Sequence, residues 1–241
     1  MQYGNLAFVY DKLMYDMPYS SWAEFIFTNF NDASNILELG CGTGSLTELL
    51  ATKYDVIALD ISEEMLDIAR QKLLKSGLNI PFIKGDMRDF KLHKKVDSIV
   101  CACDGINYLI TPDSVKQAFL SVYDNLKSGG RFIFDISSKN KLMEMCGQLY
   151  SEDCDDATYI WRNRADGEII NMDITFFVPE GDETYFRFDE QHRQRMHSVE
   201  EISTWLNECG FKIVSITDNY TDKQINEKTQ RITFIAEKIE R

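Results

Sequence analysis

Five short apolar runs, separated by segments of helical periodicity, lie between residues 20 and 137 of the chain. They read NILELG, DVIALDI, IPFIKGD, VDSIVCAC and GRFIFDIS. Nearly continuous apolar runs are typical of strands buried on both faces, and strands that alternate with helices are typical of βαβ units. The pattern therefore predicts an α/β fold, with an open and mainly parallel sheet covered by helices on both faces.

The segments between these runs carry helix-capping residues. Ser62 precedes EEMLDIARQKLLKSG, in which acidic residues come first, lysines come late and Gly77 follows. Thr111-Pro112 opens a second helix, DSVKQAFLSVYDNLKSGG, which we expect to end at Gly129-Gly130. These signals predict helices after the second and the fourth strand.

The pattern changes after Ser138. Residues 157–197 contain three segments with a period near two, ATYIWRNR, EIINMDITFFV and ETYFRFDEQHRQRM. The turn signals Asp166-Gly167 and Pro179–Asp182 separate them. This part of the chain therefore predicts an antiparallel meander and not a further βαβ unit.

The C-terminal part resumes the first pattern. Residues 198–201, Ser-Val-Glu-Glu, form a capping box for a last helix, and FKIVSITDNY and QRITFIAEK then read as two successive strands. Two strands without an intervening helix indicate an antiparallel hairpin at one sheet edge. We expect a core of residues 1–138 and 198–241, interrupted by an inserted β-sheet lid or substrate subdomain at residues 139–197.

Three glycines follow the first predicted strand, in ILELGCGTGSL (residues 36–46). In an open parallel sheet, ligands bind at the carboxyl ends of the strands, and the first strand-to-helix turn forms the floor of the site. Gly40, Gly42 and Gly44 would allow positive φ angles and a close approach of backbone N–H groups to a ligand. The turn is therefore a candidate binding site.

This turn departs from the dinucleotide fingerprint G-x-G-x-x-G. Its spacing is G-x-G-x-G, and Ser45 stands where the fingerprint has its third glycine. Glu38 lies just before the turn, where a carboxylate would repel a pyrophosphate. The sequence predicts a nucleoside-like ligand whose tail need not be anionic.

Carboxylates follow the next two strands. Asp60 comes twenty residues after Gly40, where it could accept both ribose hydroxyl protons; it could also cap the next helix, but Ser62 suits that role. Asp86 and Met87 could bind an exocyclic amino group and cover a ring face, although Gly-Asp at a strand end is also a common turn.

Together, LELGCGTG, ALD and GDM at these spacings resemble the class I S-adenosylmethionine (SAM) methyltransferases, over residues 35–137 and the final helix and hairpin. The resemblance implies a Rossmann-like seven-stranded sheet of order 3-2-1-4-5-7-6 with strand 7 antiparallel, and SAM as the cofactor. No constellation of His, Cys and Asp residues in the sequence suggests a metal. It implies that Glu38 helps to hold the amino group of the methionine moiety and that Asp60 binds the ribose. The cofactor-binding residues that it suggests are Glu38, Gly40, Cys41, Gly42, Gly44, Asp60, Ile61, Met65, Asp86, Met87 and Cys101.

The N-terminal segment VYDKLMYDMPYSSWAEF resembles the lead-in of small-molecule SAM methyltransferases that carry an inserted β-layer after strand five. In that group, aromatic residues close over the cofactor. The resemblance suggests Tyr19 and Trp22 for this role, with Tyr3 and Tyr10 as further candidates. An aromatic stripe before a helix also suits an ordinary core, so both interpretations stay open.

Acceptor contacts in this family come from the loop after strand four, here CACDGINYL, which suggests Asp104, Asn107 and Tyr108 as catalytic residues. The loop lacks the D/N-P-P-Y/F signature of amino-nitrogen methyltransferases, and no cysteine pair has the spacing of RNA C5 chemistry. The acceptor atom is therefore left open.

The segment YFRFDEQHRQRMH in the insertion should present two different faces. Its alternation places Arg187, Asp189, Gln191, Arg193 and Arg195 opposite Phe186, Phe188, Glu190, His192, Gln194 and Met196. We expect the second face to roof a pocket in which His192 is either a general base or a hydrogen-bonded structural residue. His93 and His197 are expected at the surface or at a cap.

Composition limits the choice of partners. The net charge of -13 and the pI near 4.7 disfavour binding to phosphate-rich polymers such as RNA. The only short basic runs that could favour such binding are RNR (162–164) and RQR (193–195). We expect a small-metabolite acceptor, with a tRNA or protein acceptor, or SAM binding without turnover, as alternatives. No apolar stretch suggests a membrane span, and six scattered cysteines fit a reducing cytoplasmic compartment. The oligomeric state is not indicated.

Overall fold

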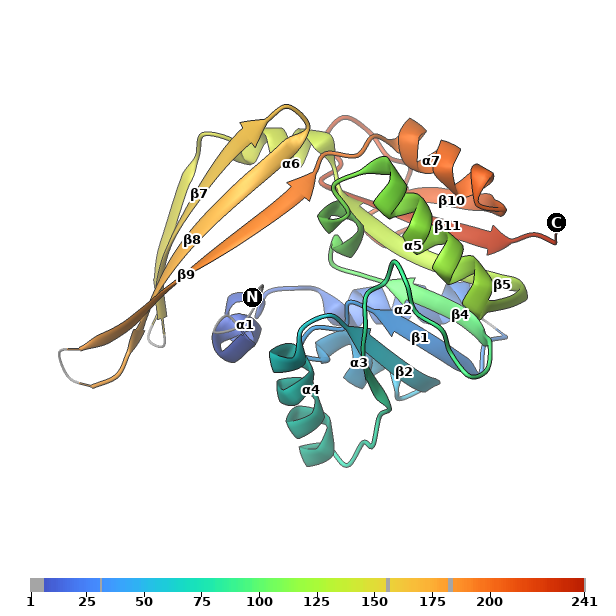
Figure 1. The fold of residues 1–241 in the computed structure, drawn as a ribbon, viewed down its shortest axis with the longest axis horizontal. Coiled ribbons are helices and arrows are strands. Elements are labelled where there is room, and N and C mark those ends of the chain that lie inside the picture. Colours follow the sequence, from blue (N-terminus) through green and yellow to red (C-terminus); the bar gives the residue numbers. More distant parts are fainter. Residues whose placement is uncertain (1–6, 31, 155–156, 182–183, 241) are drawn as a thin grey trace.

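A computed structural model describes residues 7–30, 32–154, 157–181 and 184–240. Its larger sheet has the strand order β10-β11-β5-β4-β1-β2-β3, and β11 is antiparallel to both of its neighbours. The predicted order 3-2-1-4-5-7-6 is confirmed (Figure 1). The strands are β1 (Asn35–Leu39), β2 (Asp55–Asp60), β3 (Phe82–Lys84), β4 (Val96–Cys101), β5 (Leu126–Ser137), β10 (Phe211–Asp218) and β11 (Arg231–Lys238).

Helices cover both faces of this sheet because its strand residues are apolar on both sides. In β4, Ile99 and Cys101 pack in the cluster that contains the helices α5 and α7, whereas Val100 packs in the cluster that contains α2 and α3. Helix α4 packs on β2 through a contact of Leu66 with Ala58. These helices are α2 (Tyr19–Asn29), α3 (Ser45–Leu50), α4 (Glu63–Lys75), α5 (Pro112–Asn125) and α7 (Val199–Glu208). None of the helices in the described ranges is long and apolar enough to cross a membrane.

The predicted N-terminal caps are present in three of these helices. The hydroxyls of Ser62, Thr111 and Ser198 each accept a hydrogen bond of 3.2 Å from the backbone N–H three residues later. The predicted end of α5 is wrong, however. This helix stops at Asn125, and Leu126 already pairs with Val96 of β4.

The insertion forms a separate four-stranded antiparallel sheet of order β6-β7-β8-β9. The meander is confirmed in β7 (Ala157–Asp166), β8 (Ile169–Pro179) and β9 (Tyr185–Arg195), and Gly167 takes a φ of +60° at the predicted turn. Asp182, the last residue of the second predicted turn, lies outside the described residues. Two elements before the meander were not predicted, α6 (Lys139–Met145) and β6 (Leu149–Cys154).

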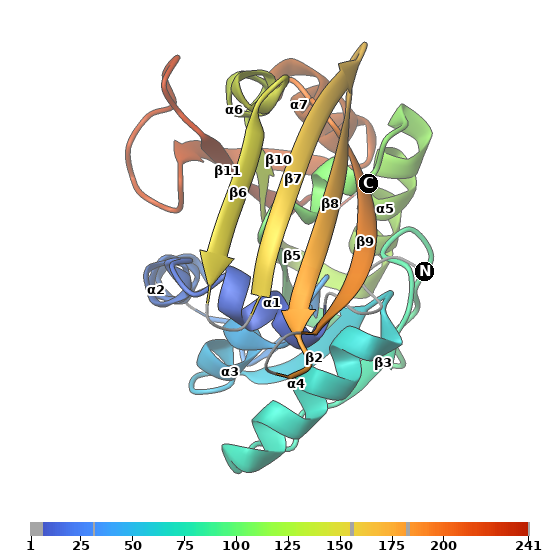
Figure 2. The ribbon, with the colours of Figure 1, turned by 90° about the vertical axis from the view of Figure 1, so that its left-hand side faces the viewer.

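The long strands of the inserted sheet stand beside the core. They extend from the end that carries α6 toward α1 (Ala7–Leu13) and α4 (Figures 1 and 2). In both views α1 lies near the far end of this sheet, next to the core. The inserted sheet and α1 thus flank the carboxyl ends of the core strands.

Candidate functional site

Two adjoining pockets lie at the carboxyl ends of the core strands. The glycine pocket, of about 400 Å³, lies over the turn after β1 and extends to Asp60, Asp86 and Thr111. The roofed pocket, of about 290 Å³, lies between the inserted sheet, α1 and the ends of β4 and β5. Tyr10, Cys103 and Tyr108 line both pockets and therefore form a shared wall.

The glycine turn opens its backbone toward the first pocket. Gly40 and Gly42 line the pocket with φ angles of +66° and +53°, a conformation that favours glycine. A Cβ on Gly42 would stand 3.9 Å from Cε1 of Tyr10, so the pocket wall is close to the bare backbone. Gly44 serves packing instead, because a Cβ there would come within 3.0 Å of the Leu73 side chain on α4.

Asp60 joins the glycine turn to the start of α4. One carboxylate oxygen accepts the N–H of Gly42 at 2.8 Å, and the other accepts the N–H of Ser62 at 2.9 Å. Burial raises the pKa of Asp60, and these N–H groups oppose the rise. Because each oxygen keeps a second lone pair and Asp60 lines the pocket, the carboxylate can also accept from ligand hydroxyls.

Asp86 and Met87 also line the glycine pocket, and a Cβ on Gly40 would stand 3.8 Å from the Met87 methyl carbon. Arg88 holds Asp86 through its Nε, which lies 3.0 and 2.9 Å from the two carboxylate oxygens, and through its Nη2. This contact lowers the pKa of Asp86. An exocyclic amino group that binds Asp86 would therefore share the carboxylate with Arg88.

Seven of the predicted cofactor-binding residues line the glycine pocket, and the other six do not. The lining residues are Gly40, Gly42, Asp60, Ile61, Met65, Asp86 and Met87. The other six are Tyr19, Trp22, Glu38, Cys41, Gly44 and Cys101.

Glu38 lies in β1, just before the glycine turn, and is only 3% exposed. The Thr47 hydroxyl donates to its carboxylate at 2.6 Å. Burial raises the pKa of Glu38 to about 8, although the Thr47 bond acts in the opposite direction. The carboxyl is therefore largely protonated near neutral pH and would ionise next to a positive charge.

The two predicted cysteines are packing residues that do not line the glycine pocket. Cys41 lies in a small cluster with Ala58 and Leu66. Cys101 lies under Gly105, where a Cβ would come within 2.8 Å of its sulfur. Both thiols are buried, and burial raises their pKa.

The N-terminal aromatic residues divide between the core and the pockets. Trp22 is buried, stacks on Tyr220 with 5.0 Å between ring centroids, and lies 4.9 Å from the Arg231 guanidinium. Tyr19 packs edge-on against Trp22. Tyr10 is the residue of this group that lines both pockets, whereas Tyr3 lies outside the described residues.

Asp11 fixes Tyr10 in place, and sequence reasoning missed it. Its carboxylate accepts from Lys72 at 2.7 Å and from the Thr43 hydroxyl, which ties α1 to α4 and to the glycine turn. An acidic residue in the N-terminal segment gave no sign of this contact, because its partners lie 32 and 61 residues away.

A buried ion-pair cluster forms the polar end of the roofed pocket. Arg231 Nη1 lies 3.0 Å from Asp104 Oδ1 and also contacts Asp135, while Gln194 donates to Asp104 Oδ2 at 2.7 Å. Burial alone would raise the pKa of Asp104, but Arg231 and Lys141 hold it below its usual value. The sequence suggested Asp104 and did not suggest Asp135 or Arg231.

Asn107 connects structural elements and lines neither pocket. Its fully buried side chain accepts the Ser137 N–H at 2.9 Å and donates to the Arg195 carbonyl at 2.8 Å. It therefore joins the loop after β4 to the ends of β5 and β9, at the position that precedes Tyr108 in the chain.

His192 lines the roofed pocket from β9, and its Nδ1 lies 3.5 Å from the Tyr108 hydroxyl oxygen. Burial lowers the pKa of His192 to about 4, which keeps the imidazole neutral near pH 7. The predicted buried face of β9 is confirmed from Phe188 to Met196, whereas Phe186 is exposed.

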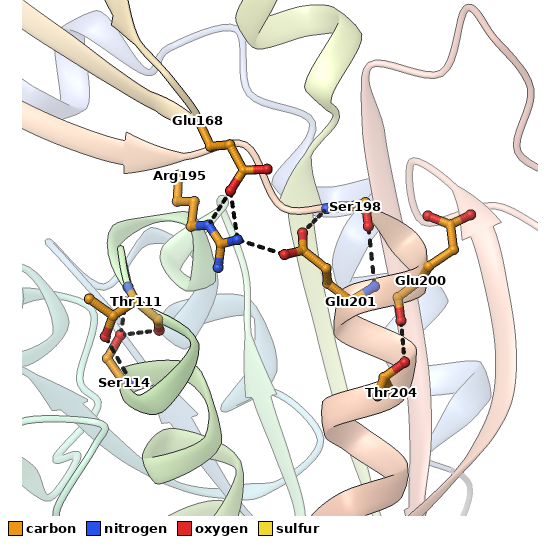
Figure 3. A network of polar contacts seen from close by, with 8 residues as sticks. All are labelled: Thr111, Ser114, Glu168, Arg195, Ser198, Glu200, Glu201 and Thr204. Atoms are coloured by element: carbon orange, nitrogen blue, oxygen red, sulfur yellow. Dashed lines mark hydrogen bonds and ion pairs between the residues drawn. The ribbon is translucent and has the colours of Figure 1, made fainter.

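Two sequence-based expectations near the end of β9 are wrong. Arg195, in the RQR run that suits a solvated strand edge, is instead buried between Glu168 at 2.7 Å and Glu201 at 2.6 Å (Figure 3). His197 was expected at the surface or a cap, but it is buried against the Trp205 ring. His93 is exposed as expected. Within the described ranges, no group of His, Cys, Asp or Glu residues could hold a metal ion.

Comparisons with known proteins agree with this geometry. A protein family described as a methyltransferase domain matches residues 36–130. "Putative methyltransferase YqeM" of Bacillus subtilis (strain 168) is 37% identical over 243 residues, which cover 99% of this chain and 98% of that protein. The crystal structure of a S-adenosylmethionine-dependent methyltransferase from Clostridium acetobutylicum superposes with a TM-score of 0.91 at 36% identity, over 99% of each chain. The dTDP-3-amino-3,4,6-trideoxy-alpha-D-glucopyranose N,N-dimethyltransferase of Streptomyces venezuelae is 33% identical over 112 residues, 46% of each chain.

Proposed function

Since the chain belongs to the class I S-adenosylmethionine-dependent methyltransferases, we propose that it transfers the methyl group of SAM to a small-molecule acceptor held in the roofed pocket. The observation that carries this proposal is the wall that the two pockets share. Tyr10, Cys103 and Tyr108 would therefore hold a methyl donor in the glycine pocket next to an acceptor in the roofed pocket.

The chemistry of the glycine pocket fits SAM. Bound SAM supplies a methyl carbon that its positively charged sulfur activates for in-line transfer. Two left-handed glycines leave the backbone open, and Asp60, Asp86 and the nearby Glu38 favour a cationic ligand. A dinucleotide would bring a pyrophosphate to these same acids.

Each of the seven predicted residues that line the glycine pocket has a proposed contact with the cofactor. Gly40 and Gly42 would lie against the methionine moiety, and the free lone pairs of Asp60 would accept the ribose hydroxyls. Met87 would cover the adenine ring, while Asp86 would share its carboxylate between Arg88 and the adenine amino group. The lining residues Ile61 and Met65 would add apolar contacts. Cys41, Gly44, Cys101, Tyr19 and Trp22 would support these residues from behind.

Tyr108 and His192 are the proposed catalytic pair. The neutral imidazole could take the proton that a hydroxyl or amine acceptor loses. Asp104 would shape the polar end of the pocket, and Asn107 would position Tyr108 from behind. Orientation of two reactants in adjoining pockets is a large source of rate acceleration, roughly 7–11 kcal/mol in well-oriented systems.

A small acceptor fits the enclosure of the roofed pocket. Residues 139–197 would act as its lid, and residues 1–138 with 198–241 as the SAM-binding core. The amino-sugar N,N-dimethyltransferase among the relatives also supports a small molecule, as does the net charge of -13, which opposes RNA.

The acceptor class can be tested with methyl-labelled SAM. The protein would be incubated with a cell extract that is afterwards separated into small-molecule, RNA and protein fractions. We expect label in the small-molecule fraction, at a level that falls with the His192→Gln variant. Label confined to RNA or protein would support a macromolecular acceptor, and SAM binding without label in any fraction would support a binding module.

A further inference from the structure

Lys141 brings a positive charge to the polar end of the roofed pocket. It lies on α6 and lines the pocket together with Asp104 and Arg231. Its Nζ donates to the Ser137 hydroxyl at 3.1 Å, and no carboxylate of the described residues lies within ion-pair distance of it. An ammonium group has three donors, so Lys141 retains hydrogen-bonding capacity toward a ligand.

The nearby carboxylates are already occupied by other donors. Asp104 accepts from Arg231 and Gln194, one at each carboxylate oxygen. Asp135 accepts from Tyr220 at 2.7 Å, from the Asp104 N–H at 3.0 Å and from Arg231. Because these acids are satisfied without it, Lys141 is the cation of this cluster that a ligand can engage.

The rest of the roofed pocket is mainly apolar, with many flat or sulfur-containing side chains. Rings come from β7 and β8, and methionines come from α6, β8 and the segment after α1. These residues include Met17, Met145, Tyr159, Trp161, Met172 and Phe176. Aromatic and thioether surfaces favour a planar apolar ligand, and a few polar groups then fix its orientation.

From this arrangement we infer that the methyl acceptor has a planar, mainly apolar body and one anionic group, which the Lys141 ammonium binds. The anionic group is a carboxylate or a phosphate monoester, both of which an ammonium group recognises. This inference rests on the proposed function, because it names the class of molecule that occupies the acceptor pocket.

The test is equilibrium binding by calorimetry, with the protein saturated with S-adenosylhomocysteine. The probes are benzoate and phenyl phosphate as anions and benzamide as the neutral isostere. We expect at least one anion to bind the unmodified protein about tenfold or more tighter than benzamide, since a charge-assisted hydrogen bond is worth about that factor. The preferred anion distinguishes carboxylate from phosphate.

Lys141→Met should remove this preference, and Lys141→Arg should retain part of it. Lys139→Met, on an exposed lysine of the same helix, should leave it unchanged. The inference is overturned if neither anion binds saturably, if benzamide binds as tightly, or if the preference survives in Lys141→Met. SAM affinity is measured separately for each variant and reports on folding and on the cofactor site. A failure of SAM to bind would contradict the proposed function, whereas a missing preference for anions would contradict only the present inference.

Discussion

The hydroxyl oxygen of Tyr108 lies 3.5 Å from Nδ1 of His192, although the two residues are 84 positions apart in the chain. The contact joins the loop after β4 of the core to β9 of the inserted sheet, at the edge of the wall between the two pockets. The proposed catalytic pair is thus assembled from the core and the insertion.

Replacing His192 tests its role as a proton acceptor. In His192→Gln we expect turnover to fall by roughly 10²–10⁴-fold, the range typical of general acid–base groups, with SAM affinity unchanged. The measurements are steady-state kinetics with the acceptor and calorimetry with SAM. An equal loss of SAM affinity would instead indicate a structural role for His192.

The pH dependence of SAM affinity tests Glu38. Its pKa of about 8 leaves the carboxyl protonated below that pH, so affinity for a cation should rise as the pH increases from 6.5 to 9. Glu38→Gln should lack the part of this rise that comes from Glu38 and should bind SAM about tenfold more weakly than the unmodified protein at pH 9. Calorimetric titrations at several pH values provide the check; an identical pH profile in the variant would exclude Glu38 as the source.

The free energy of unfolding should also depend on pH through Glu38, and it should decrease as the pH rises. Because the native pKa of Glu38 lies above the unfolded value of 4.5, the native state binds more protons between these pH values. Its contribution to the free energy of unfolding is therefore fully present below pH 4.5 and is lost as the pH rises through about 8. Urea unfolding of the Glu38→Gln variant should lack this component.

Asp60 is predicted to serve both the cofactor and the glycine turn. Asp60→Ala should weaken SAM binding by about 1–3 kcal/mol and should also lower the unfolding temperature, since the N–H groups of Gly42 and Ser62 lose their acceptor. Asp67→Ala, on an exposed position of α4, is the matched control. Unchanged SAM affinity in Asp60→Ala would remove the ribose role.

Arg195 should stabilise the junction between the insertion and the core. Its guanidinium contacts Glu168 and Glu201 and lies 5.5 Å from the Trp205 ring. We expect Arg195→Met to lower the free energy of unfolding by about 1–3 kcal/mol, because a nearly buried pair of ionic contacts is lost while both acids keep access to water. Arg193→Met, exposed on the same strand, should have little effect in the same urea titration.

Features with a local cause could be predicted from the sequence. The alternation of strands and helices followed from the apolar runs, and the final hairpin followed from two strands without a helix between them, whereas the strand order was implied by the resemblance to the class I methyltransferases. The caps at Ser62, Thr111 and Ser198 depend on residues within one turn. Strand β6 escaped prediction because Ser151, Glu152 and Asp153 interrupt any apolar pattern and residues 149–153 are exposed, as suits an edge strand. Helix α6 escaped because it is only seven residues long.

The parts of the site that depend on tertiary contacts could not be predicted. Arg231 and Asp135 are 96 residues apart, and either one alone reads as an ordinary charge within a strand. Cys103 and Asp104 take left-handed backbone angles without a glycine to signal them. Tyr10 lies in the shared wall because the neighbouring Asp11 ties helix α1 to the core. No local sequence pattern indicated this contact.

A crystal structure of the protein with bound SAM tests the central claim most directly. The account predicts the ribose hydroxyls on Asp60 and the sulfonium methyl directed at the wall of Tyr10, Cys103 and Tyr108, toward the pocket that His192 roofs. SAM bound elsewhere, or with its methyl group directed away from that wall, would contradict it.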